Sequence, residues 1–144
     1  MARHDDPRIA RIIDFFEQLS PAELPRLAQI YTDDAHFKDP FNEVQGVPAI
    51  GHIFEHMFRT LHAPRFVIHD VVVQGGQCFL TWDFVFRLKR GSAEVVVRGG
   101  SHLLLAEDGR IRLHRDYWDV AEELYEKLPV LGALMRWLRR RVNS

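Results

Sequence analysis

The spacing of apolar residues predicts three helices in the first part of the chain. Asp6 and Pro7 provide an N-cap and a first-turn proline, and the apolar residues that follow recur at helical spacing. Ser20 and Glu23 have the spacing of a capping box, although Pro25 kinks or delays the helix that they begin. The strongest apolar stripe belongs to the third helix. The helices are expected at residues 7–19, 21–30 and 48–61.

Beyond residue 65 the pattern changes to β-branched and aromatic runs, which are separated by turn sequences that contain glycine. Residues 79–89 alternate cleanly, with Trp82, Phe84 and Phe86 on one face, so that face is expected to be buried. The later strands carry apolar residues on both faces, as expected where helices or a partner subunit cover both. Four antiparallel strands are predicted, the first from residue 65 and the others at residues 79–89, 94–106 and 110–119, after a short extended segment at residues 36–39.

Length and composition indicate a small globular domain. The 144 residues, 47% of them hydrophobic, suffice for one core, and a net charge of −1 gives no general attraction to nucleic acid. Cys78 is the single cysteine, which excludes an intrachain disulfide. Residues 1–6 are polar and no apolar run reaches the length of a membrane span, so a cytoplasmic protein is expected.

The order and spacing of several motifs resemble one superfamily. Two helices lead into Tyr31-Thr32-Asp33-Asp34-Ala35 and Phe37-Lys38-Asp39-Pro40, and after an apolar helix four long strands end in Arg115-Asp116-Tyr117-Trp118-Asp119. The chain thus resembles the SnoaL-like, ketosteroid-isomerase-like group of the nuclear transport factor 2 superfamily. The resemblance implies an α+β cone over residues 1–122, in which a bent antiparallel sheet wraps around three N-terminal helices. It also implies a deep apolar pocket for a hydrophobic small molecule and a homodimer through the outer face of the sheet.

The fold alone leaves the chemistry open, because this superfamily contains isomerases, cyclases, hydrolases, dehydratases and non-catalytic binding modules. The resemblance to ketosteroid isomerases places the catalytic base at Asp39, where the following proline holds the backbone extended. It places the two oxyanion donors at Phe15 and Ser101, which are not the tyrosine and aspartic acid of those enzymes. Losing one such donor costs about 100-fold or more in rate, so steroid isomerisation itself is not expected.

The last strand also resembles that of limonene-epoxide-hydrolase-like proteins, in which two carboxylates and a bridging arginine activate water. Asp116 matches one carboxylate, but the other should lie near Ser101, where the sequence has none, although Arg98 lies three residues earlier. What remains is a pair, Asp39 and Asp116, in which one carboxyl group acts as a base and the other as an acid if both enter one pocket.

Each candidate has a structural interpretation beside the functional one. Asp39 is also suited to cap a turn, Asp116 to join an ion-pair network, and His114 to be a satisfied strand histidine. Because the core face of a cone is also the wall of its pocket, core residues and ligand contacts overlap. Ligand contacts are expected from Phe15, Tyr31, Phe54, Trp82, Phe84, Ser101, His114 and Trp118. The alternative to an enzyme is a non-catalytic ligand-binding or dimerisation module.

No metal or cofactor is expected from the sequence. His52 and His56 have a metal-compatible spacing on the third helix, but they lie opposite its apolar stripe and have no third ligand nearby. The chain also lacks a phosphate loop and a dinucleotide-binding fingerprint.

Residues 123–144 are predicted to form an amphipathic, basic helix. An apolar stripe is accompanied there by a cationic cluster that consists of Arg136, Trp137, Arg139, Arg140 and Arg141. Such a helix can pack on its own domain or on a dimer partner, with the arginines near the negative end of the helix dipole. It can also lie in a membrane interface, where each arginine gains ~1 kcal/mol from anionic lipid.

Overall fold

The first helix begins at the residue that its cap predicts. In the computed structural model, which describes residues 4–127, 137 and 140–141, helix α1 (Pro7–Glu17) follows Asp6. The Asp6 carboxylate accepts the backbone N–H of Arg8 at 3.0 Å. This bond satisfies one of the N–H groups that a helix leaves unpaired at its start. The helix ends two residues before the predicted end at residue 19.

The predicted second helix is divided into two short pieces. A 3-10 helix, η1 (Pro21–Arg26), is followed by a single α-helical turn, α2 (Leu27–Ile30). Pro25 lies inside η1 and has no N–H to donate, which accounts for the break. The predicted capping box was wrong, because the side chain of Ser20 makes no capping hydrogen bond.

The remaining elements follow the predicted order, with one addition. Helix α3 (Val47–Thr60) confirms the third predicted helix, and the four long strands are confirmed. The first strand is longer than the segment predicted at residues 36–39, and a three-residue strand after it was not predicted, because three residues are too few to show an alternation. The strands are β1 (Tyr31–Lys38), β2 (Glu43–Gln45), β3 (His62–Gln74), β4 (Gln77–Arg87), β5 (Glu94–Leu105) and β6 (Ile111–Tyr117).

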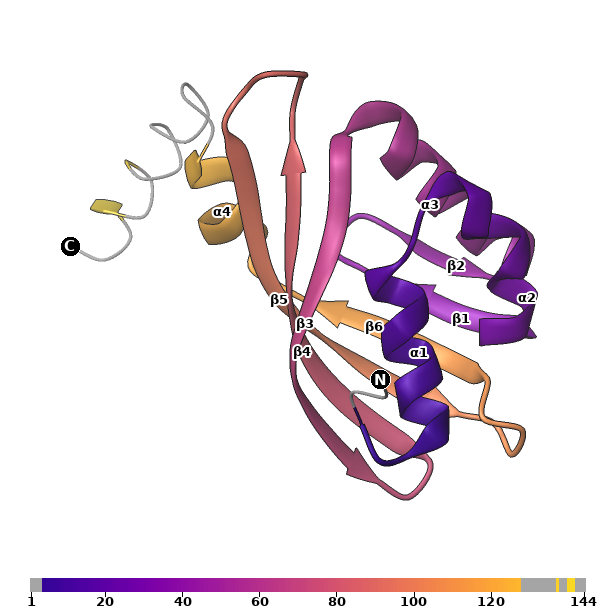
Figure 1. The fold of residues 1–144 in the computed structure, drawn as a ribbon. Coiled ribbons are helices and arrows are strands. Elements are labelled where there is room, and N and C mark those ends of the chain that lie inside the picture. Colours follow the sequence, from indigo (N-terminus) through magenta and orange to yellow (C-terminus); the bar gives the residue numbers. More distant parts are fainter. Residues whose placement is uncertain (1–3, 128–136, 138–139, 142–144) are drawn as a thin grey trace.

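The described residues form one six-stranded sheet in the order β2-β1-β6-β5-β4-β3. Neighbouring strands are antiparallel except β1 and β6, which are parallel. The sheet is strongly bent, and α1 and α3 lie against its concave side (Figure 1). Where the register between β3 and β4 shifts, the backbone N–H of Ile68 donates to the carboxylate of Glu17 at 2.9 Å, which ties the end of α1 to β3. The architecture is the α+β cone that the sequence predicts.

An ion pair between a buried carboxylate and an exposed arginine holds the chain against the sheet after the last strand. Helix α4 (Val120–Glu123) lies beside β5 (Figure 1), so the predicted boundary between residues 122 and 123 falls inside it. The carboxylate of Glu123 is buried and accepts hydrogen bonds from the backbone N–H, Nε and Nη2 of Arg98 at 2.8, 3.0 and 2.9 Å. A buried carboxylate needs such partners, because an unpaired charge in the interior is costly.

The predicted basic helix at the C-terminus falls largely outside the described residues, which beyond η2 (Tyr125–Lys127) are 137, 140 and 141. The guanidinium of Arg141 lies 5.5 Å from the centre of the Trp137 ring, within the range of a cation–π contact. Packing of this helix on the domain or on a membrane stays a prediction. In the described part of the chain, every helix is too short or too polar to cross a membrane.

Candidate functional site

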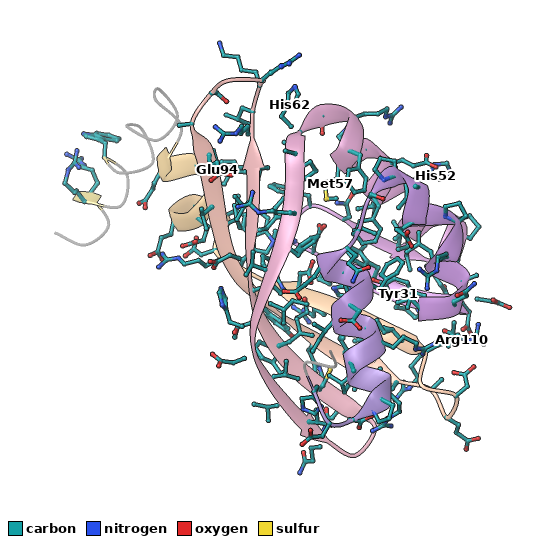
Figure 2. All side chains as sticks on the ribbon, in the orientation of Figure 1. Tyr31, His52, Met57, His62, Glu94 and Arg110 are labelled. Carbon is teal, nitrogen blue, oxygen red and sulfur yellow. The ribbon has the colours of Figure 1, made fainter. Side chains whose placement is uncertain are left out.

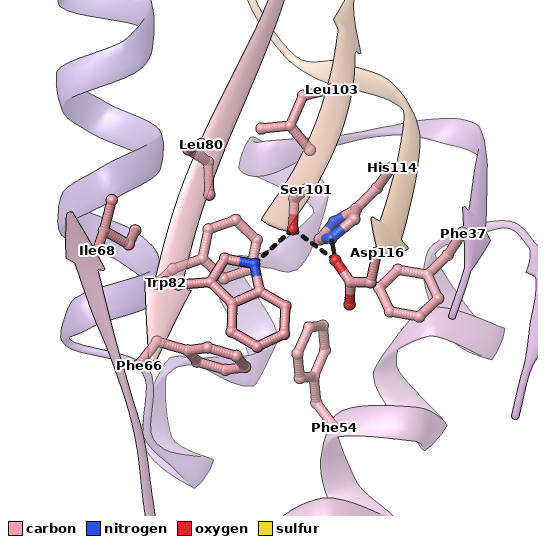
Figure 3. A pocket seen from close by; sticks show the side chains of 11 residues that line it. Phe37, Phe54, Phe66, Ile68, Leu80, Trp82, Ser101, Leu103, His114 and Asp116 are labelled. Carbon is pink, nitrogen blue, oxygen red and sulfur yellow. Dashed lines mark hydrogen bonds and ion pairs between the residues drawn. The ribbon is translucent and has the colours of Figure 1, made fainter. Parts of the chain in front are cut away.

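An apolar pocket lies between the concave face of the sheet and the helices α1 and α3. It contains about 410 Å³ of empty space, its open mouth included. Apolar side chains from six elements make up most of the wall: Phe16, Phe37, Phe54, Phe66, Ile68, Leu80, Trp82 and Leu103. Three polar side chains, Ser101, His114 and Asp116, lie together on one side (Figure 3). A few polar groups in an apolar cavity are typical of a small-molecule site.

The three polar side chains belong to a hydrogen-bond network that crosses four strands. Trp82 Nε1 donates to Ser101 Oγ at 2.9 Å, and Ser101 Oγ donates to Asp116 Oδ1 at 2.5 Å (Figure 3). His114 Nε2 lies 2.6 Å from the same carboxylate oxygen. The hydroxyl of Tyr31 lies 2.7 Å from His114 Nδ1. The network therefore joins β4, β5, β6 and β1.

The carboxylate of Asp116 has one satisfied oxygen and one open oxygen. Oδ1 is bonded to both Ser101 and His114, whereas no hydrogen bond from another described residue reaches Oδ2. In Figure 3 the second oxygen points into the pocket, toward Phe54. The Asp116 side chain is 15% exposed, so the charge is largely removed from water. A carboxylate oriented in this way can accept a hydrogen bond or a proton from a bound molecule.

Tyr31 reaches the network from outside the pocket. The residue is fully buried, and Figure 2 labels it in the interior of the fold. Burial, together with the nearby charge of Asp116, raises the pKa of the Tyr31 hydroxyl well above its usual value. The hydroxyl therefore keeps its proton and is a donor toward His114.

The alternation of side chains along the last two strands brings the polar residues together. His114 and Asp116 are two residues apart on β6, and the prediction that they share a face is confirmed. Ser101 pairs directly with Asp116 in the register of β5 and β6. Residues that are directly opposite on one face have their side chains about 5 Å apart at Cβ, which allows a direct hydrogen bond.

Gly99 leaves the space that the Trp82 indole occupies. The two residues face each other in the register of β4 and β5. A Cβ atom at position 99 would lie 2.6 Å from Cη2 and 2.9 Å from Cζ2 of the indole, and 3.0 Å from Cβ of Trp118. No side chain larger than hydrogen fits there without moving the ring that donates to Ser101.

Five of the predicted site residues line the pocket, and the others lie elsewhere. The five are Phe54, Trp82, Ser101, His114 and Asp116. Phe15 packs in the core with its ring 5.4 Å from that of Phe16. Phe84 stacks on Phe66 at 4.7 Å, and the Trp118 ring lies 5.7 Å from that of Phe41. These three and Tyr31 were expected as ligand contacts, and the structure does not bring them to the pocket wall.

Asp39 is also absent from the pocket wall, contrary to the expected pairing with Asp116. Its Oδ1 accepts the backbone N–H groups of Phe41 and Asn42 at 2.8 and 2.6 Å. The amide of Asn42 donates to both carboxylate oxygens at 3.1 and 3.2 Å. Asp39 therefore caps the turn between β1 and β2, which is the structural interpretation offered by the sequence.

The sequence pattern did not identify several apolar lining residues: Phe16, Phe37, Phe66, Ile68, Leu80 and Leu103. The alternation of side chains along the strands could have identified some of them. Leu80 is two residues before Trp82, and Leu103 is two residues after Ser101, so each shares a face with a predicted site residue. Phe66 and Ile68 are also two apart, but the strand that holds them was predicted from residue 65 without an assignment of its faces.

The comparison with known proteins gives a family and a set of structural neighbours. Residues 12–114 match the family model described as the SnoaL-like domain. No curated protein matches the sequence. A Catenulispora acidiphila protein with a ketosteroid-isomerase-like fold, solved with trimethylamine, is similar with a TM-score of 0.71 and 12% identity over 84% of this chain and 92% of that chain.

Two further neighbours have named activities. A candidate SnoaL-like polyketide cyclase from a Jannaschia species is similar with a TM-score of 0.70 and 14% identity, over 83% of this chain and 93% of that one. A limonene-epoxide-hydrolase-like epoxide hydrolase from M. tuberculosis is similar with a TM-score of 0.64 and 17% identity, over 95% of this chain and 94% of that one. At these identities the likeness concerns the fold.

Replacing Asp39 by alanine is expected to destabilise the protein without changing ligand binding. The substitution removes an acceptor for two backbone N–H groups and one side-chain amide, a loss of roughly 1 to 2 kcal/mol in the free energy of unfolding. Urea unfolding measures that loss, and titration with benzyl alcohol measures pocket affinity. A large loss of affinity in a folded Asp39→Ala protein would contradict the structural role.

Replacing Gly99 by alanine is expected to displace the Trp82 indole. Crowding of this kind costs roughly 1 to 3 kcal/mol in a packed interior, and the hydrogen bond to Ser101 is lost. Thermal unfolding and tryptophan emission report the two effects. Gly76→Ala is the control, because a Cβ there lies at an ordinary 3.7 Å from the nearest atom. Equal stability of the two variants would show that the indole does not depend on Gly99.

Proposed function

The chain belongs to the SnoaL-like family, and on that premise we propose that its pocket binds an uncharged, largely apolar small molecule from which Asp116 removes a proton. The observation that supports this role is that the two oxygens of Asp116 have different surroundings. Oδ1 is held by Ser101 and His114, and Oδ2 faces the pocket. This arrangement suits a general base, because the carboxylate is fixed and one lone pair is directed into the pocket.

The charge of the pocket supports an uncharged ligand. Asp116 is the one acidic residue among the eleven lining residues, and none of the eleven is lysine or arginine. An anionic ligand would meet the carboxylate at close range in a region of low dielectric, where like charges repel by several kcal/mol. The apolar wall favours a ligand that buries hydrocarbon or aromatic surface.

The single carboxylate among the lining residues favours proton transfer within the substrate over activation of water by two carboxylates. A second carboxylate, which the epoxide-hydrolase mechanism requires, is not among the lining residues. Ring closure, which the name of the polyketide cyclase neighbour gives, needs a base that takes a proton from the substrate. Isomerisation needs a base that takes a proton and returns it.

Selectivity for ligand charge tests the proposed pocket. Benzyl alcohol is expected to bind, and benzoate of nearly the same shape is expected to bind at least about tenfold more weakly, because the Asp116 carboxylate repels it. Ligand-observed NMR titration at pH 8 measures both. Asp116→Asn should bring the two affinities together, whereas Asp39→Asn, which removes a carboxylate outside the pocket, should leave them apart. Absence of binding by both probes would contradict the pocket itself.

Deuterium exchange tests the proposed base. The α-protons of 2-indanone, an uncharged aromatic ketone, exchange in D2O by proton abstraction, and proton NMR follows their loss. The wild-type protein is expected to accelerate the exchange, and Asp116→Asn to reduce that acceleration by about 100-fold or more. Binding of 2-indanone without acceleration would instead support the alternative, a non-catalytic binding module.

We also propose a homodimer through the outer face of the sheet. Val72, Phe79 and Tyr117 are 68%, 40% and 46% exposed, and the rings of Phe79 and Tyr117 lie 6.5 Å apart. Large apolar side chains that gather on one face of a sheet mark an interface. Sedimentation equilibrium should give a dimer, and Phe79→Glu should weaken it. A wild-type monomer at 100 µM, about the upper range for weak dimers, would contradict the proposal.

A further inference from the structure

We propose that Tyr31 is a positioning residue that keeps His114 neutral, with its proton on Nε2, and so leaves the carboxylate of Asp116 available as a base. The inference rests on the proposed function, because it explains how the proposed base is maintained. It follows from the donors and acceptors of the network that runs from Trp82 to Tyr31. Each group in that network has a limited set of roles, and the distances leave one consistent arrangement of protons.

The arrangement is fixed first at the Trp82 end. An indole nitrogen can only donate, so Ser101 Oγ accepts from Trp82 Nε1 at 2.9 Å. The hydroxyl proton of Ser101 is then directed to Asp116 Oδ1 at 2.5 Å. Asp116 is therefore an acceptor at Oδ1, and a proton lies on the Ser101 side of that bond.

The arrangement is fixed again at the Tyr31 end. The Tyr31 side chain is fully buried and its hydroxyl keeps its proton. Its partner, at 2.7 Å, is His114 Nδ1, and the described residues provide no other hydrogen bond to this hydroxyl. Tyr31 therefore donates to Nδ1, which must carry a lone pair. The ring proton of His114 is then on Nε2, where it is directed at Asp116 Oδ1 over 2.6 Å.

A second proton on His114 would break this arrangement. Nδ1–H would face the O–H of Tyr31, and the hydroxyl would have to turn its proton away from the only partner that the described residues offer. A buried donor without a partner costs roughly 1 to 3 kcal/mol. The phenol thus opposes formation of the imidazolium, in a site where the adjacent carboxylate alone would favour it.

The other described groups around the imidazole carry no charge that would change the balance between the neutral and the protonated form of His114. The titratable groups against the ring are Tyr31 from β1 and Asp116 from β6. The remaining neighbours are apolar. The ring of Phe37 of β1 lies at 4.7 Å and that of Phe16 of α1 at 5.8 Å, and Leu103 of β5 is paired with His114 of β6. The His114 side chain is 6% exposed, so water contributes little.

The protonation state of His114 decides what Asp116 can do. A neutral imidazole donates one hydrogen bond to Oδ1 but places no positive charge beside the carboxylate, so that Oδ2 attracts a proton from the pocket. An imidazolium would form an ion pair with the same carboxylate and reduce its tendency to accept a proton. Tyr31 acts on the base through His114 and does not touch the ligand.

Nitrogen NMR of the histidine ring tests this inference in the full-length protein. Long-range proton–nitrogen correlation at pH 8 distinguishes Nδ1–H from Nε2–H, and loss of one signal set in His114→Gln assigns the ring. The wild type is expected to show Nε2–H with Nδ1 shifted by an accepted hydrogen bond. In Tyr31→Phe that shift should disappear, because the lone pair of Nδ1 has lost its hydrogen bond.

Two controls separate this effect from general disturbance. Trp82→Phe removes the donor at the opposite end of the network and should leave the Nδ1 signal of His114 near its wild-type position. The ring-nitrogen signals of exposed His52, at the far surface of α3, should be alike in all variants. An Nδ1–H tautomer in the wild type overturns the inference even if Tyr31→Phe does not fold. An unchanged Nδ1 signal of His114 in a folded Tyr31→Phe protein also overturns it.

Failure of the inference can be distinguished from failure of the proposed function. Suppose that Asp116 is needed for exchange of the 2-indanone protons but that Tyr31→Phe leaves the His114 spectrum unchanged. The proposal of Asp116 as the base then stands, and the proposed role of Tyr31 is wrong. If the spectra change as expected but the wild type does not accelerate exchange, the proposed tautomer of His114 stands and the proposed catalytic role of Asp116 is wrong. Tyr31→Phe should bind benzyl alcohol as the wild type does, since Tyr31 does not line the pocket.

Discussion

The largely buried carboxylate of Asp116 is the constraint on which the arrangement of the site depends. A carboxylate in apolar surroundings is costly unless hydrogen bonds compensate it, and its side chain is 15% exposed. Ser101 and His114 provide that compensation, and each is itself buried and needs a partner of its own. Trp82 and Tyr31 are those partners, so that one charge on β6 determines polar residues on β4, β5 and β1.

The bend of the sheet allows this network and the apolar pocket to share one face. On β4 and β5 the side chains alternate between the pocket and the outer surface, with Leu80 and Ser101 inside and Phe79 outside. Two adjacent glycines on β5 leave space for aromatic rings, one on the inner face of the sheet and one on the outer face. Gly99 makes room for the Trp82 indole inside, and Gly100 makes room for the Phe79 ring, to which a Cβ would come within 2.6 Å.

The sequence predicts the fold well because its strongest signals are local. The cap at Asp6, the apolar stripe of α3 and the alternation of the strands each depend on residues that are close in the chain. The structure contains the helices and strands that these signals predict. His114 and Asp116 could likewise be placed on one face from their spacing alone. The pairing of Tyr31 with His114 could not, because it requires the parallel contact of β1 with β6, which are separated by most of the chain.

The role of Asp39 shows a different limit. A residue before proline is extended, and that conformation suits a side chain that enters a pocket and one that caps a following turn equally well. The neighbouring Asn42, whose backbone and side-chain N–H groups both bind Asp39, decides between them, and no periodic pattern reports such a contact. Resemblance to a family transfers the position of a residue, but the local hydrogen bonds determine its use.

The direction of the Ser101 hydroxyl finally limits the chemistry that this site supports. Nucleophilic catalysis by serine needs a base that takes the hydroxyl proton, usually a histidine. Here Ser101 is bonded to Asp116, while both ring nitrogens of His114 are engaged by Asp116 and Tyr31. The serine, the histidine and the aspartate therefore do not form a nucleophilic triad, although all three line one pocket. Their bonds converge on one carboxylate oxygen and leave the other facing the pocket, a geometry that suits a proton acceptor.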